Sequence, residues 1–143
     1  MTTAEQLTQI FKDNFVAYFR SHVAHVNITG RNFRSDHKLL EGVYTRRQEQ
    51  IDRIGELLRS INEYMPCDLA ELLLDSELDT GMLQGDSDFL LTMIKEDLEH
   101  LTNEFRELIV IADSEGEEAI GNYAQDQVLD LTKSIWMLEA TLG

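Results

Sequence analysis

The sequence has little cysteine, proline or glycine: one cysteine, one proline and eight glycines among 143 residues. A single cysteine excludes a disulfide within the chain and is typical of the reducing cytoplasm, where we expect this protein to lie. So few turn residues argue against an all-β fold. The longest purely apolar run, residues 108–112, is far too short to cross a membrane. Residues 1–6 lack the basic and apolar segments of a signal peptide.

Basic residues are also scarce, and this excludes some partners. Twelve Lys and Arg stand against 27 Asp and Glu, which leaves a net charge of −15. This excess repels DNA phosphates and anionic lipids and attracts cations. No lysine precedes Lys12, so we see no basic extension that could hold DNA. We therefore expect neither direct DNA binding nor a membrane partner.

The length and the hydrophobic content suit one folded domain spanning residues 1–143. Apolar residues make up 43% of the chain, enough for a core. They recur at steps of three and four in four long segments, the pattern of amphipathic helices. We predict these helices over about residues 4–27, 35–64, 87–112 and 117–138. The apolar face of the first helix is predicted to include Phe19.

The connection between the second and third predicted helices is the only long one. It is about twenty residues long, follows Pro66, and contains a short helix from Leu69 to Leu74 that Asp68 would cap. We predict that Ser35 caps the second helix and that Asp86 or Ser87 caps the third. Four helices with one long crossover predict an all-α, ferritin-like four-helix bundle with a short extra helix in the crossover.

Two acidic or imidazole-containing pairs lie on the second predicted helix. His37 and Glu41 are four residues apart, and so are Asp52 and Glu56, so each pair shares one face of the helix. The two pairs are separated by about 22 Å of helix and cannot bind one ion together. They nevertheless lie within about 60° of the same face. A second copy packed antiparallel would join the first pair of one chain to the second pair of the other, which makes two identical sites.

His25, near the end of the first predicted helix, could complete each site. Nitrogen and oxygen donors without thiolate suit iron or manganese better than structural zinc. An alternative from spacing alone is a solvated acidic face, or ion pairs with Arg46, Arg47 and Arg53.

The wider pattern resembles the Dps family of mini-ferritins (DNA-binding proteins from starved cells). In that family a His-Trp-Asn motif ends the first helix, and a second His follows twelve residues after the first. An acid comes four residues after that His, a second acid eleven residues further on, and a Glu four residues beyond it. The residues at the corresponding positions here are His25, Val26, Asn27, Gly30, Asn32, Phe33, His37, Glu41, Asp52 and Glu56. The ending Trp136-Met137-Leu138 with Ala140 is similar to the last helix of the family.

The resemblance implies a homo-oligomer of twelve subunits that forms a hollow shell. It implies intersubunit ferroxidase sites that oxidise Fe(II) with hydrogen peroxide or oxygen, store ferric iron and protect against oxidative damage. His25, His37 and Glu41 would come from one subunit and Asp52 and Glu56 from its two-fold mate, forming a di-iron site that manganese or zinc could also occupy. The alternatives are a ferritin-fold shell with weak or no turnover that binds metal or packs, and a plain monomeric bundle.

Two residues depart from the family pattern. Glu41 stands where the family usually has Asp and is one methylene longer, which can change the spacing of the metals. Val26 replaces the usual Trp, whose indole lies near the site in relatives and absorbs oxidising equivalents. The resemblance therefore predicts that peroxide is used here less efficiently without the release of radicals.

Acids at the start of the fourth predicted helix match the region where the family lines its three-fold pores. The candidates are Glu117, Glu118, Asp126 and Asp130. The first two also have a plain structural explanation, because acids favour the N-terminal end of a helix dipole. A bacterioferritin-type site needs Glu-x-x-His on two helices, and only one Asp97-x-x-His100 occurs, so we interpret His100 as structural or exposed.

Overall fold

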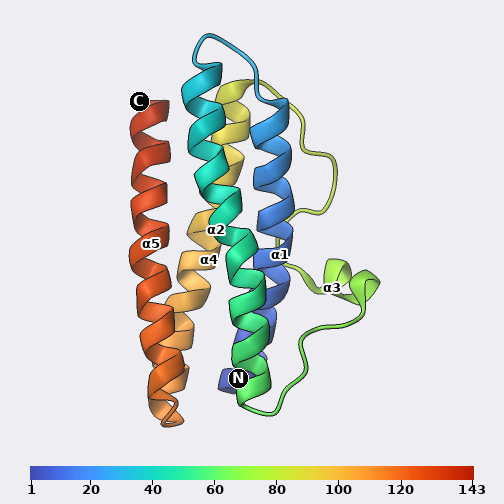
Figure 1. Cartoon of the computed structure of the whole chain (residues 1–143), viewed down its shortest axis with the longest axis vertical. Coiled ribbons are helices and arrows are strands. Elements are labelled where there is room, and N and C mark those ends of the chain that lie inside the picture. Colours follow the sequence, from blue (N-terminus) through green and yellow to red (C-terminus); the bar gives the residue numbers. More distant parts are fainter.

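The computed structural model describes all 143 residues, which form five helices and no strand. The helices are α1 (Thr3–Asn27), α2 (Phe33–Ser60), α3 (Leu69–Asp75), α4 (Ser87–Ser114) and α5 (Glu118–Leu142). The four long helices stand side by side, and α3 projects from the crossover beside α1 (Figure 1). This confirms the predicted all-α, ferritin-like four-helix bundle with a short extra helix in the crossover. None of these helices combines the length and the apolar character that a membrane span requires.

The crossover determines the helix directions. It runs the length of the bundle, so α2 and α4 begin at the same end (Figure 1). Helix α1 packs on α2 and on α4, and α4 packs on α5. Fully buried apolar residues line these contacts, among them Leu7, Leu98 and Phe105.

Local capping chemistry explains where the helices begin. Asp86 accepts a hydrogen bond from the Phe89 N–H (2.9 Å), and Asp68 accepts one from the Glu71 N–H (3.1 Å). The predicted cap of α3, Asp68, and one of the two predicted alternatives for α4, Asp86, are thus confirmed. The Ser35 cap is wrong, because α2 already begins at Phe33 and the Ser35 hydroxyl donates back to a carbonyl instead.

The end of α2 also differs from the prediction. The helix ends at Ser60, four residues before the predicted end at Tyr64. Asn62 adopts a left-handed backbone (φ +67°), and the Glu63 N–H donates to the Leu58 carbonyl (2.9 Å). This is a Schellman-type ending, for which asparagine is one of the few suitable residues other than glycine. The chain therefore leaves the helix before the proline is reached.

Polar side chains join α2 to α5. Arg46 and Arg47 lie 3.2 and 3.6 Å from the carboxylate of Asp130, and Tyr123 donates to Gln50 (2.6 Å). Arg47 is fully buried, and burial lowers its pKa to about 10. Both arginines thus pair across the bundle rather than with the acids of α2, which removes two partners from the ion-pair alternative.

The apolar face of α1 is wider than the bundle covers. Phe19, predicted to lie inward, is 62% exposed. It lines an apolar pocket of about 440 Å³ with Val23 of α1, Leu69 and Leu73 of α3, and Met82 of the crossover. The placement of Phe19 in the core is therefore wrong, because an open pocket, and not packed side chains, lies between this part of α1 and α3.

Candidate functional site

The structure brings His25 and His37 together. His25 is near the end of α1 and His37 in the second turn of α2, and the short turn between the helices folds them into contact. Their rings stack with centroids 3.7 Å apart and planes 15° apart. His25 is buried, whereas His37 is half-buried. Two of the five predicted ligands are thus adjacent within one chain.

Reciprocal hydrogen bonds orient both imidazoles. The Nδ1 of His25 lies 2.7 Å from the His37 carbonyl oxygen, and the Nδ1 of His37 lies 2.7 Å from the His25 carbonyl oxygen. A carbonyl only accepts, so each Nδ1 carries the proton and donates. In the neutral rings each Nε2 keeps a free lone pair, which is the form that binds metal. Both rings are therefore held in the tautomer whose Nε2 can donate to a metal ion.

The predicted carboxylates lie farther along α2. Glu41 is exposed one turn after His37, and Asp52 and Glu56 are exposed near the other end of the helix. The Asp52 carboxylate raises the pKa of Glu56 by a hydrogen bond and by its like charge, as expected of side chains in contact. About 22 Å of helix separates this acid pair from the histidines, so one chain does not bring the two halves together. A site joined across two subunits stays a prediction.

Aromatic side chains surround the histidine pair. The Phe33 ring stacks on His37 at 4.9 Å, and the Tyr44 ring centroid lies 4.9 Å from that of His25. Val26, which occupies the position of the family Trp, is 60% exposed. The pair is thus shielded by Phe33 and Tyr44, and Val26 contributes no ring.

The predicted pore acids have unequal surroundings. Glu117 is the half-buried residue that precedes α5, and Glu118 follows it in the first turn. Asp126 is exposed and makes no ion pair, whereas the charge of Asp130 is held by Arg46 and Arg47. Glu118 is likewise exposed and unpaired, so Glu118 and Asp126 are the two acids whose carboxylates are free to meet a passing cation. A pore role for all four acids stays a prediction.

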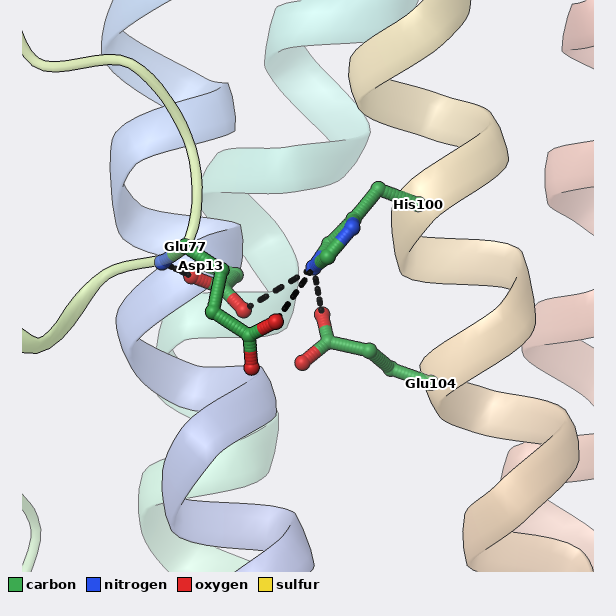
Figure 2. A group of neighbouring side chains, drawn as sticks. All are labelled: Asp13, Glu77, His100 and Glu104. Carbon is green, nitrogen blue, oxygen red and sulfur yellow. Dashed lines mark hydrogen bonds and ion pairs between the residues drawn. The ribbon is translucent and has the colours of Figure 1, made fainter.

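A second cluster of metal-ligating side chains lies between α1, α4 and the crossover (Figure 2). The His100 Nε2 is 3.5 Å from the Asp13 Oδ2, 3.6 Å from the Glu77 Oε2 and 3.5 Å from the Glu104 Oε1. Asp13 is fully buried and Glu104 is 6% exposed. Burial, followed by the like charge of Asp13, raises the pKa of Glu104 to about 10. Three carboxyl groups are thus crowded around one imidazole.

The sequence predictions did not include this cluster. The interpretation of His100 rested on Asp97-x-x-His100, but the partner on the same helix is Glu104, four residues later. That spacing is the same as between His37 and Glu41 and was available as a signal. Asp13 and Glu77 come from α1 and the crossover, and no regular spacing in the chain relates them to His100.

The chain is similar to known proteins over its whole length. Residues 4–143 match the ferritin-like domain family (Ferritin). The DNA protection during starvation protein of Helicobacter pylori is 33% identical, with all of both chains covered. Antigen TpF1 of Treponema pallidum is 32% identical over 96% of this chain and 78% of that protein. The crystal structure of Dps from Listeria monocytogenes superimposes with a TM-score of 0.95 at 26% identity, covering 100% of this chain and 94% of that one.

Proposed function

Because this chain belongs to the Dps mini-ferritins of the ferritin-like superfamily, we propose that it oxidises Fe(II) at sites shared by two subunits. The ferric product is kept inside a shell of twelve subunits. One observation carries this proposal. Two stacked imidazoles, each held at its Nδ1 by a backbone carbonyl at 2.7 Å, keep their Nε2 lone pairs free for a metal ion.

The donor set suits the proposed chemistry. Neutral imidazoles of His25 and His37 bind Fe(II), and the carboxylates of Glu41, Asp52 and Glu56 bind Fe(III) more strongly, which makes oxidation easier. Two Fe(II) ions give up one electron each. Hydrogen peroxide takes these two electrons with two protons and becomes two water molecules. Oxygen in its place takes the two electrons with two protons and becomes hydrogen peroxide. Manganese or zinc would compete for the same donors.

Exposed apolar side chains support an assembly of many subunits. Large side chains at Phe19, Leu69, Leu73 and Met82 are 40% exposed or more. Together they line one apolar pocket between α1 and the crossover. A contiguous apolar patch of this kind is typical of a surface that another protein chain covers. The half-sites on α2 also need a second copy to become complete.

Ferroxidase activity can be tested directly. Fe(II) is added to the protein without oxygen, peroxide is then added, and ferric absorbance is followed against buffer alone. We expect the protein to raise the rate above buffer, and sizing to show a particle much larger than 16.4 kDa. A large particle that oxidises iron no faster than buffer would indicate a shell without turnover. A species of about 16 kDa would indicate a monomeric bundle.

A shell with slow turnover is the second candidate, because of one observation. Val26 is an exposed aliphatic residue at the end of α1, where the family has an indole close to the site. Without that ring, fewer oxidising equivalents are absorbed beside the iron. In the same assay this candidate gives a large particle and a rate close to that of buffer.

The proposed pore can be tested at Asp126. We expect Asp126→Lys to slow iron uptake several-fold in an intact shell, because a positive side chain repels Fe(II) on its path. The matched control is Glu96→Lys, which makes the same charge change at an exposed position of α4. Uptake is measured as ferric iron that co-elutes with the shell. Equal rates for the two variants would mean that Asp126 is not on the path.

A further inference from the structure

We propose that each subunit has a second site for a divalent transition-metal ion, formed within one chain by Asp13, Glu77, His100 and Glu104. The side chains come from α1, the crossover and α4 and point toward one another (Figure 2). The site shares no residue with the histidine pair. It would therefore exist whether or not iron is oxidised between subunits.

The spacing of the four donor atoms fits a metal ion better than hydrogen bonds. An ion with tetrahedral ligand bonds of about 2.1 Å sets neighbouring ligand atoms about 3.4 Å apart. The three distances from the His100 Nε2 to carboxylate oxygens are 3.5, 3.6 and 3.5 Å, and all four atoms lie within 4.8 Å of one another. A hydrogen bond would need about 2.7–3.2 Å. The His100 Nε2 thus lies beyond hydrogen-bond distance of each carboxylate oxygen, at the spacing that two ligands of one ion have.

Two of these atoms have no other partner. The His100 Nε2 and the Glu104 Oε1 are shielded from solvent and make no hydrogen bond. The Glu104 side chain is more than nine-tenths buried and is directed into the cluster (Figure 2). A buried polar atom without a partner is costly, and a carboxylate oxygen especially so. A cation between the four atoms would satisfy both at once.

The surrounding residues hold Asp13 in a ligating position. Its Oδ1 accepts from the Ser76 hydroxyl and from the Glu77 N–H, both at 2.7 Å. Its Oδ2 receives only a long hydrogen bond from Gln9 (3.3 Å) and faces His100. Hydrogen bonds to the second oxygen of a ligand carboxylate are what orient such ligands in metal sites. The same two bonds tie the crossover to α1 and so place Glu77 over the cluster.

An ion can reach this site from solvent. The side chains of Glu77 and His100 are 57% and 33% exposed, whereas Asp13 and Glu104 form the buried floor. A polar pocket of about 340 Å³ adjoins the cluster and is also lined by Asn103. Water in this pocket can complete the coordination. One imidazole with three carboxylates suits Zn(II), Fe(II) or Mn(II), and the four-donor spacing favours zinc as a probe.

A zinc-soaked crystal of the shell tests the site directly. We expect an anomalous peak in every subunit, bonded to the His100 Nε2 and to oxygens of Asp13, Glu77 and Glu104. The soak uses Zn²⁺ alone, so the result does not depend on ferroxidase activity. Zinc at other positions of the same crystal with none between these four residues would overturn the proposal, since the metal would have had the chance to bind.

Zinc counting in solution gives an independent test. After dialysis against micromolar Zn²⁺, His100→Ala and Glu104→Gln should each hold one zinc fewer per subunit than the wild type. Asn103→Ala removes a polar residue from the same pocket without removing a ligand and should keep the wild-type count. The double variant His37→Ala with Glu41→Ala should keep this zinc as well. Wild-type counts in folded His100→Ala and Glu104→Gln shells would overturn the proposal.

Discussion

Two variants that are each inactive should recover about a quarter of the wild-type ferroxidase sites when they are assembled into one shell. One variant carries His37→Ala with Glu41→Ala, and the other carries Asp52→Ala with Glu56→Ala. Alone, each variant lacks one half of every site, so its rate should fall to that of buffer. This test rests on the proposed function.

The expected recovery follows from two-fold symmetry. At an interface between the two variants, one site receives both damaged halves and stays inactive. The other receives His37 and Glu41 from one subunit and Asp52 and Glu56 from its mate, and is complete. Random mixing makes about half of the interfaces mixed, each with one complete site of two. Both variants are unfolded and refolded together, and ferric absorbance is followed after peroxide is added.

A matched mixture separates rescue from a general effect of mixing. His37→Ala assembled with Glu41→Ala should stay at the buffer rate, because both changes lie on the same half and every site still lacks one ligand. A complete site cannot form within one chain, since about 22 Å of α2 separates its halves. If shells shown to contain both double variants oxidise no iron, the intersubunit assignment is wrong.

Features that depend on helical spacing were predictable from the sequence. His37 and Glu41 share a face because they are four residues apart, and the bundle follows from four apolar stripes. His25 was expected to join the site of His37 because it lies near the end of the first predicted helix, and the family resemblance supported the same set. The stacked geometry of this contact depends on the backbone carbonyls of His25 and His37 themselves, which no residue pattern specifies.

Features that depend on tertiary placement were missed. The four-residue cluster needs α1, α4 and the crossover to meet, and Asp13 reaches Glu77 only because the crossover returns past α1. Phe19 belongs to an apolar stripe, but whether the crossover covers that part of the stripe is decided by the path of the chain. The end of α2 depended on one left-handed asparagine, Asn62, rather than on the more obvious proline.

Asp97→Ala should lower the free energy of unfolding by about 3–5 kcal/mol, the usual cost of removing one partner of a buried ion pair. The Asp97 Oδ2 accepts from the Arg20 Nε at 2.7 Å, and the two side chains are only 9% and 7% exposed. This pair joins α4 to α1 inside the bundle. Without Asp97, the Arg20 guanidinium keeps only the Asp79 carbonyl (3.1 Å) and has no opposite charge.

Two further variants show whether the cost comes from the unpaired charge. Arg20→Met with Asp97→Leu removes both charges and should recover most of the loss, since apolar pairs of similar volume often replace buried ion pairs without penalty. Glu99→Ala breaks the exposed pair with Lys95 on α4 (3.8 Å) and should cost less than about 1 kcal/mol.

Urea unfolding followed by helical circular dichroism measures the stability of all these variants. Every variant is measured at the same subunit concentration, because assembly also contributes to stability. If Asp97→Ala costs no more than Glu99→Ala, water must reach Arg20 and the pair is not a buried one. If the double variant is as unstable as Asp97→Ala, the lost packing, and not the charge, accounts for the effect.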